Sequence, residues 1–280
     1  MKSTALILSI ALLGASGALE AQSSRFAQNL IAAEAGPEGG AGQTASPVRG
    51  AAGSTGALSR IAFGGGFSPL GVNMMAAANL NRYMNLRVTG SVFKYTDTGI
   101  STNGFNVNAD LNLASAGLSL DVYPFPNRGL RLSPGLLFYN ANGATATFAV
   151  QGGTSFTLNN FTYYASSTNP VQGTGNLGLN SQNPAFTITG GWGNMIPRRG
   201  GHLSFPVEVG VALIGAPSVN IVLNSGQVCD AEGQNCVNVA TDADVQSNLQ
   251  AQIAKYRSDL DPLKTYPIVS AGVAYAFRIR

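Results

Sequence analysis

Two-residue alternation of side-chain character is the feature that most constrains the fold of this chain. It is strictest in the last stretch, VSAGVAYAFRIR. Counting from Val269, every second residue through Ile279 is apolar, whereas Ser270, Gly272 and the other residues between them are small or polar. Because successive side chains of a β-strand point to opposite faces, this period of two predicts a strand with two unlike faces.

The same alternation recurs along most of the chain. One stretch, SPLG, leaves open whether residues 61–80 form one strand or two; if they form one, SVNIVL has to supply another strand. Within residues 104–123 the apolar set changes phase, which predicts a β-bulge at Ala114–Ser115. The predicted strands are residues 61–68, 71–80, 84–95, 104–123, 129–148, 184–194, 202–214 and 266–279.

The connections between these strands alternate in length. NRYM, PFPNRG and IPRRG are short and rich in turn formers, whereas TDTGISTNG, residues 141–183 and residues 224–265 are long and polar. Tight turns at one end and long loops at the other are typical of an outer-membrane barrel.

Residues 241–261 break the strand pattern and predict an amphipathic helix before the last strand. Its apolar stripe must cover the barrel rim or the strands beside it. Thr241 and Asp244 occupy capping positions, and Pro262 ends the helix. The stripe is formed by Val245, Leu249, Ile253, Tyr256 and Leu260.

The N-terminus has the pattern of a secretory signal: Lys2, an apolar run from Ala5 to Leu13, then small residues. We therefore expect a signal peptide at 1–21, a flexible Ala-, Gly- and Ser-rich extension at 22–58, and an outer-membrane barrel at 59–280. Beyond the signal no run of 18 apolar residues occurs, which argues against membrane-spanning helices.

Composition indicates which solvent each strand face meets. Charged residues make up 10% of the chain, against roughly 25% in an average domain. The less apolar face carries Gly, Ser, Asn, Thr and Ala, which suit the narrow interior of a closed sheet, so the apolar face is expected to meet lipid. The alternative is a secreted β-sandwich with its apolar faces in a dry core. Aromatic residues near strand ends would form interfacial girdles: Tyr83, Tyr123, Phe125, Trp192, Tyr266 and Tyr275.

The predicted fold is therefore all-β, an antiparallel transmembrane barrel of about eight strands with one helix before the last. The stretches NLRVTGSVFKY, LSLDVYPFPNRGLRLSPGLLFYNAN, GGWGN, LSFPVEVGVALIGAPSV and DLDPLKTYPIVSAGVAYAF also resemble the recurring blocks of a poorly characterised family of bacterial outer-membrane β-barrel proteins. The resemblance covers most of the chain from about residue 70. It implies an outer-membrane location and contact with the barrel-assembly machinery, and it implies no catalytic residues. Glu208 stands where the family usually has Asp.

Charged residues on the inward faces are the candidate site. By strand parity Arg87, Asp121 and Glu208 share the lumen, with Asp110 and Arg131 further along their strands. They form either a selectivity or gating cluster or a structural ion-pair network, and we favour the latter. Cys229 and Cys236 are expected to form a disulfide rather than a metal site, because the chain is exported and no histidine lies near them.

No enzyme activity, cofactor or metal is expected. Ser204, His202 and Glu208 alternate on one strand face, but this spacing is an ordinary product of alternation. Asp230, Glu232, Asp242 and Asp244 lack the spacing of a calcium loop. A net charge of +3 without a basic run argues against nucleic acid.

The predicted function is an integral outer-membrane barrel, in contact with outer-membrane lipids, with a structural or narrow porin-like role. The alternative is a surface adhesin or receptor whose long loops bind an extracellular ligand that the sequence does not identify. FAVQGGTSFTLNNFTYY, in the longest loop, would then be either a binding surface or strands continuing above the membrane.

Overall fold

The computed structural model describes residues 56–125, 128–198 and 201–279. The predicted signal peptide and nearly all of the predicted N-terminal extension lie outside these residues. The barrel strands are β1 (Arg60–Ser68), β2 (Gly71–Asn79), β3 (Met84–Thr102), β4 (Phe105–Val122), β5 (Arg131–Asn140), β10 (Ala185–Trp192), β12 (Val207–Leu213) and β16 (Thr265–Arg278).

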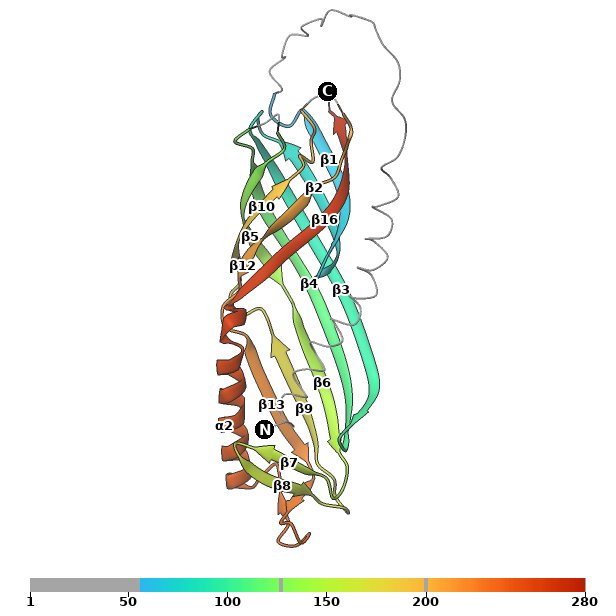
Figure 1. The fold of residues 1–280 in the computed structure, drawn as a ribbon, viewed down its shortest axis with the longest axis vertical. Helices are drawn as coiled ribbons and strands as arrows, with labels where there is room; N and C mark the ends of the chain where they lie inside the picture. Colours follow the sequence, from blue (N-terminus) through green and yellow to red (C-terminus); the bar gives the residue numbers. More distant parts are fainter. Residues whose placement is uncertain (1–55, 126–127, 199–200, 280) are drawn as a thin grey trace, which may run out of the picture. The chain divides into compact units, whose positions relative to one another are not determined.

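These strands close into a ring. Every neighbouring pair is antiparallel, in the order β1, β2, β3, β4, β5, β10, β12, β16, and β16 pairs with β1 again (Figure 1). The short β11 (Leu203–Ser204) also pairs with β16. The prediction of an antiparallel barrel of eight strands is confirmed, and within the ring each strand is paired on both sides; beyond Val92, β3 pairs with β4 alone.

The stretch SPLG makes a turn, so residues 61–80 form two strands. Gly71 begins β2 with φ +102°, a conformation that L-residues rarely adopt. A Cβ there would also lie 2.4 Å from the carbonyl oxygen of Val92 on the next strand. The tight approach of β2 to β3 at this turn therefore requires glycine.

The outside of the barrel is a continuous apolar surface. All eight strands contribute outward side chains that are more than a third exposed, and Met74 reaches 73% and Phe67 70%. A soluble monomer rarely exposes an apolar patch of more than a few hundred Å². The surface includes Phe63, Phe67, Val72, Met74, Val88, Val92, Leu118, Leu132, Phe186, Ile188, Val207, Val209, Val269, Val273 and Phe277.

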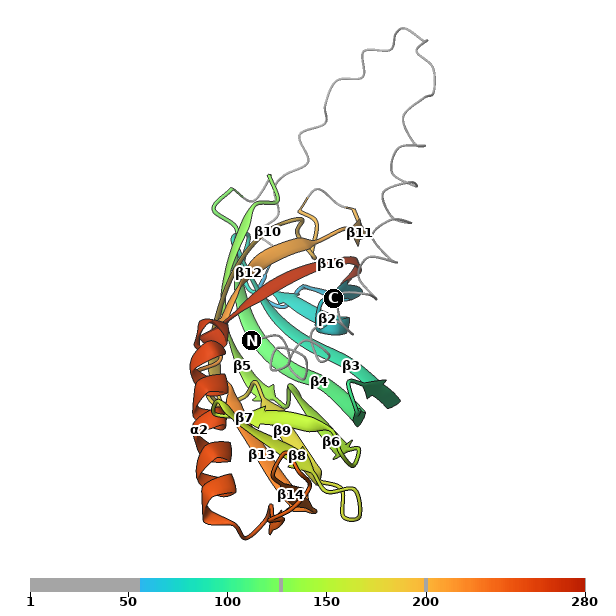
Figure 2. The ribbon, with the colours of Figure 1, turned by 60° about the horizontal axis from the view of Figure 1, so that its bottom comes forward.

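Beyond the ring, the wall of the barrel continues as a second region, here called the distal domain. Residues 105–112 of β4 leave β5 and pair with β6 (Gly143–Val150), which pairs with β9 (Gln172–Gly178), which pairs with β13 (Ser218–Ser225). A smaller sheet is made of β7 (Ser155–Leu158), β8 (Phe161–Ala165), β14 (Gln227–Cys229) and β15 (Val237–Asn238) (Figures 1 and 2).

The phase change in β4 has a different cause from the one predicted. The register between β3 and β4 runs without a shift from Met84↔Val122 to Asp97↔Ala109, so β4 has no bulge against β3 at Ala114–Ser115. The pairing of β4 with β5 does shift nearby, between Ala116 and Gly117, but there β5 carries the extra residue, Phe138. Instead, the apolar face changes sides. In the barrel Leu118 points outward and is 39% exposed, whereas in the distal domain Val107 and Leu113, on the opposite face, are buried. The strand keeps its geometry while its apolar side chains change from the exposed outer face of the barrel to a buried core.

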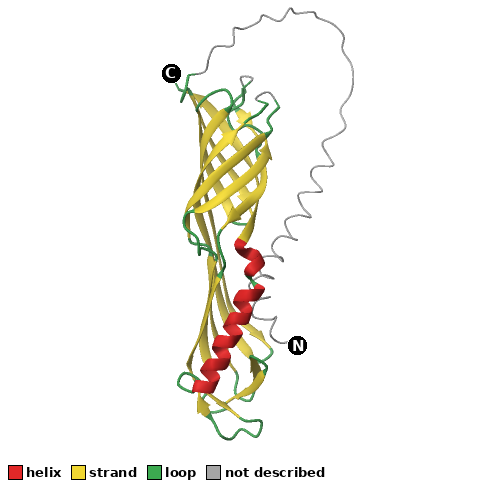
Figure 3. Ribbon diagram, turned by 90° about the vertical axis from the view of Figure 1, so that its left-hand side faces the viewer, coloured by secondary structure: helices red, strands yellow, loops and turns green. Residues whose placement is uncertain are grey.

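The helix α2 (Ala243–Asp259) packs on β13 and β7 of the distal domain, not on the barrel rim (Figure 3). Val245, Leu249 and Ile253 are buried, as the apolar stripe predicts. The cap differs from the prediction: the Asp242 side chain accepts hydrogen bonds from the backbone amides of Asp244 and Val245. A 3₁₀ turn, η2 (Asp261–Lys264), then leads into β16.

The predicted strand at residues 129–148 needs correction. These residues form two strands, β5 and β6, because β4 pairs with β5 along its barrel half and with β6 along its distal half. Because residues 61–80 form two strands, SVNIVL does not have to complete the barrel, and it lies in β13 of the distal domain. Within the described residues, no helix is both long and apolar enough to cross a membrane.

Candidate functional site

The middle of the barrel interior holds a cluster of charged side chains from four strands. Arg87 Nε lies 3.0 Å from one carboxylate oxygen of Asp121, and Arg87 Nη2 lies 2.5 Å from Glu208 Oε2. Arg131 Nη2 contacts the same Glu208 oxygen at 2.8 Å. Ser133 donates a hydrogen bond of 2.7 Å to Asp121. We call these five residues the lumen cluster.

The lumen cluster is buried and electrically balanced. Two guanidinium groups face two carboxylates, and the side chains are between 0% and 8% exposed. Burying a charge without a partner is costly, whereas paired charges repay part of the desolvation. Each charged group of the cluster has a partner of opposite charge, although Arg131 Nε itself makes no hydrogen bond. The cluster therefore fills the cross-section of the barrel in place of apolar side chains.

Next to the lumen cluster, the connection between β10 and β12 folds back into the barrel. Its Met195 and Ile196 are fully buried and pack against the small inward residues Ala62, Ala77 and Ala276, with Met75 beside them. The sequence predicted a short connection at IPRRG but not that its described residues 196–198 lie inside the barrel. We call residues 194–198 the plug. Gly193, with φ +92°, allows the chain to turn inward at its start.

Hydrogen bonds fix the plug in place. Asn85 donates to Asn194 Oδ1 at 3.0 Å and accepts from Arg198 Nη2 at 2.8 Å. Arg60 donates to the carbonyl oxygen of Pro197. Arg131 connects the two layers, because its Nη1 donates to the carbonyl oxygen of Gly193 at 3.2 Å. The plug and the lumen cluster thus form two contacting layers across the interior.

On the other side of the lumen cluster lies a cavity with a volume of about 80 Å³. Arg87 and Glu208 line it, together with hydroxyl side chains from several strands. The wall mixes these polar groups with apolar side chains, among them Leu70, Met75 and Leu137. Its hydroxyl-bearing residues include Thr89, Ser91, Ser119, Thr187, Thr189 and Ser270.

Several predicted residues lie elsewhere. Asp110 is exposed in the distal domain, where it accepts a hydrogen bond from Thr96, so it does not share the lumen with Arg87. Of the six aromatic residues predicted for girdles, Tyr123 is fully buried inside the barrel and Tyr266 lines the lumen cavity. The other four, Tyr83, Phe125, Trp192 and Tyr275, are exposed.

The side chains of His202, Ser204 and Glu208 have separate partners. The His202 ring stacks on the Tyr275 ring, with 5.4 Å between the two ring centroids, and the His202 Nδ1 contacts the carbonyl oxygen of Ala276. Ser204 donates to the carbonyl oxygen of Met195, and Glu208 is held by two arginines. Each is thus occupied by the barrel wall, the plug or the lumen cluster.

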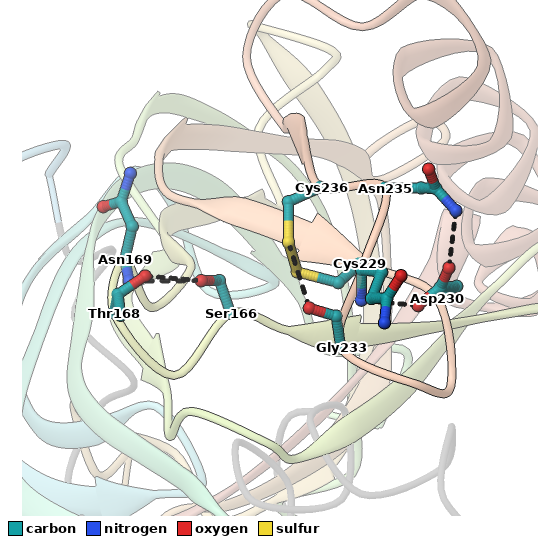
Figure 4. Close-up of a disulfide and its surroundings, with 9 residues drawn as sticks. Ser166, Thr168, Asn169, Cys229, Asp230, Gly233, Asn235 and Cys236 are labelled. Carbon is teal, nitrogen blue, oxygen red and sulfur yellow. Dashed lines mark hydrogen bonds between the residues drawn. A yellow bond between two sulfur atoms is a disulfide. The ribbon is translucent and has the colours of Figure 1, made fainter.

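In the distal domain, Cys229 and Cys236 form a disulfide, as predicted (Figure 4). The four carboxylates considered for calcium are divided between two places. Asp242 caps α2 and Asp244 follows it, whereas Asp230 accepts hydrogen bonds inside the disulfide loop that also carries Glu232. Among the described residues no group of three His, Cys, Asp or Glu side chains is placed to hold a metal ion.

Solved structures share this architecture. The crystal structure of Acinetobacter baumannii CarO2 matches with a TM-score of 0.51 and 21% sequence identity, over 79% of this chain and 99% of CarO2. The chain has a CarO2-like fold. CarO of the same organism matches with a TM-score of 0.49 and 21% identity, over 79% of this chain and 98% of that chain. No family model and no curated protein matches the sequence.

The likeness to CarO2 bears on the fold alone, and in the fold it agrees with the resemblance seen in the sequence. Sequence reasoning identified Arg87, Asp121, Arg131 and Glu208 but missed the plug. The signal for the plug was Met195 and Ile196, two large apolar residues inside an otherwise polar connection next to basic residues. Such a pair has to be buried somewhere, and the nearest apolar space is the alanine-lined end of the barrel.

Proposed function

We propose that this chain is an integral outer-membrane barrel with a closed interior, which anchors the distal domain at the cell surface. The observation that carries the proposal is the pair of contacting layers inside the barrel, where Met195, Ile196 and Asp121 are all fully buried. An eight-stranded barrel is only wide enough for side chains to fill, and at the level of the plug and the lumen cluster they fill it. The structural half of the predicted role is thus favoured over the porin-like half.

The outer-membrane location is supported by two independent features. The first is the apolar surface on all eight strands, which needs lipid to cover it. The second is the predicted secretory signal at residues 1–21. We propose the orientation in which the short turns of the barrel face the periplasm and the distal domain faces the outside of the cell.

Labelling of single cysteines on intact cells tests the orientation. Lys255, on α2, and Arg82, in the β2–β3 turn, are both exposed and lie at opposite ends of the chain's fold. We expect a membrane-impermeant maleimide to label Lys255→Cys on intact cells and Arg82→Cys only after permeabilisation. The reverse pattern, or no enrichment of the protein in the outer-membrane fraction, contradicts the proposal.

Planar-bilayer recording tests closure. Purified wild-type protein is expected to give no steady single-channel openings, because both the lumen cluster and the plug lie across the interior. Steady ohmic openings from the correctly folded wild type contradict a closed barrel and favour the porin-like role.

A second candidate is a surface receptor or adhesin, as the sequence alternative states. It is favoured by the construction of the distal domain, which has its own buried core and a helix held by specific contacts. Gln252 of α2 accepts a hydrogen bond from the backbone amide of Asn159 at 3.0 Å, and Asn248 donates to the hydroxyl of Tyr163 at 2.9 Å. A fixed scaffold of this kind suits ligand binding better than flexible loops do.

A further inference from the structure

The distal domain contains a polar cavity next to the disulfide. Its volume is about 250 Å³. One wall is formed by the end of β8 and the segment that follows β8, and the other by the disulfide loop after β14. The cavity is separate from the barrel lumen and shares no lining residue with the lumen cavity. The polar groups of its wall come from Tyr164, Ser166, Ser167, Thr168, Gln227 and Asp230.

Both walls of the cavity are held in place without a ligand. On one side β8 pairs with β14 through Val228↔Ala165 and Cys229↔Tyr164. On the other side of the cavity, the disulfide joins the two ends of its loop. Figure 4 shows Ser166 and Thr168 on one side of the disulfide and Asp230 on the other. A preformed cavity loses less conformational entropy on binding than a loop that must first become ordered.

The charge available to a ligand is small. The Asp230 carboxylate is already occupied on both oxygens, by the Gln234 backbone amide at 2.6 Å and by Asn235 Nδ2 at 2.8 Å. The residues that line the cavity include no lysine, arginine or histidine. A phosphate or carboxylate ligand would therefore meet a carboxylate and no cation, and a cation would meet a carboxylate that is already in use.

The groups that remain are hydroxyls, one side-chain amide and one aromatic ring; the hydroxyls of Ser166 and Thr168 hydrogen-bond each other at 3.1 Å and keep further donor and acceptor capacity for a ligand. Hydroxyls both donate and accept hydrogen bonds, and an aromatic ring offers an apolar face with a polar tip. This combination matches a neutral molecule that carries many hydroxyl groups on a ring with an apolar face. The cavity is also a little smaller than the roughly 300 Å³ at which pockets for drug-sized ligands begin, which fits one sugar ring.

We propose that this cavity binds one neutral sugar residue of a glycan. The proposal rests on the receptor role given above as the second candidate, and it supplies the class of ligand for that role. Tyr164 offers its ring to the apolar face of the sugar, while Ser167, Thr168 and Gln227 exchange hydrogen bonds with the sugar hydroxyls. The disulfide fixes the shape of the loop wall, and the pairing of β8 with β14 holds that wall beside the other.

Ligand-observed NMR on the full-length protein in detergent tests the proposal. The probes are D-glucose, D-galactose, D-mannose and N-acetyl-D-glucosamine, each alone, with N-acetylneuraminic acid as the anionic comparison. We expect saturable binding of at least one neutral sugar and none of the acid. Failure of all four neutral sugars to bind, or preferential binding of the acid, overturns the proposal.

A matched pair of substitutions places the binding. Ala231 is exposed and lines the cavity, so Ala231→Trp fills it without removing a fold contact, whereas the neighbouring Glu232 is exposed and does not line it. We expect Ala231→Trp to weaken sugar binding by about tenfold or more, equivalent to about 1.4 kcal/mol, and Glu232→Trp to retain it. Equal affinities in the two variants, with both proteins folded as judged by heat-modifiable migration, overturn the assignment.

This binding experiment is independent of where the protein resides. Sugar binding is measured on the purified protein and does not depend on cell-surface display, which the cysteine labelling measures separately. Labelling that fails while sugar binding persists contradicts the orientation alone, and binding that fails while labelling persists contradicts the cavity alone.

Discussion

Arg87 on β3 and Glu208 on β12 form an ion pair of 2.5 Å across the barrel interior, although 121 residues separate them in the sequence. Arg87 also holds Asp121 on the adjacent β4, so one guanidinium neutralises parts of two carboxylates. The barrel interior is thus filled by charges that compensate each other, and removal of one charge leaves the others without full pairing.

Arg87→Ala is expected to destabilise the folded barrel by about 3–5 kcal/mol, because it leaves two buried carboxylates with too little positive charge. Denaturant unfolding in detergent micelles or vesicles measures this change. Lys94→Ala is the control, since Lys94 is exposed on the same strand and has no ion pair among the described residues. Equal midpoints for the two variants would show that the lumen cluster does not stabilise the fold.

Ile196→Ala tests the packing of the plug. The side chain is fully buried against alanines and Met75, so we expect a loss of about 2–5 kcal/mol, as for other large-to-small changes in a core. Val237→Ala, at an exposed position of the distal domain, is expected to change little. If Ile196→Ala unfolds at the wild-type denaturant concentration, the plug is not packed as described.

The disulfide is expected to act locally. Replacing Cys229 and Cys236 by Ser removes a short covalent loop, whose contribution is about 2.5 kcal/mol in the chain-entropy model. Because the loop lies in the distal domain, hydrogen exchange should accelerate in β8 and β14 and stay unchanged in β1 and β16. Acceleration in the barrel strands of the double-serine variant would contradict a local role.

Asp242→Ala removes the cap that the structure assigns to α2. The expected cost is about 1 kcal/mol of helix stability, because two backbone amides lose their acceptor. Faster hydrogen exchange in the first turn of α2 measures the loss. Thr241→Ala is the control, since Thr241 was the predicted cap; a larger effect of Thr241→Ala would reverse the assignment.

The barrel could be predicted from the sequence because the alternation of side chains directly reports a two-faced strand. In β16, the odd-numbered residues from Val269 to Phe277 point outward and the even-numbered residues from Ser270 to Ala276 point inward, as predicted. The distal domain was harder to predict because its strands alternate with the opposite sense: Val107 faces a core while Asn106 faces water. The same period of two gives no indication of which solvent lies outside.

The charged part of the site followed from strand parity, which places Arg87, Asp121 and Glu208 on inward faces. The plug did not follow, because residues 194–198 have no periodicity and their position depends on space left between distant strands. Asp110 was misplaced because the expected bulge at Ala114–Ser115 would have brought it to the same face as Asp121. Without a bulge in β4 the two residues are an odd number of positions apart, so Asp110 points to the opposite face.

The central claim concerns β4, which runs through both regions. Its outward face contacts lipid in the barrel, whereas the same face of the strand meets water in the distal domain. Leu118 and Asn106 lie on β4 with the same parity, one in each region, so they form a matched pair. We would measure the free energy of unfolding in phospholipid vesicles for Leu118→Arg and Asn106→Arg. The account predicts a loss of about 2–4 kcal/mol for Leu118→Arg and a change within about 0.5 kcal/mol for Asn106→Arg; equal small losses at both positions would contradict it.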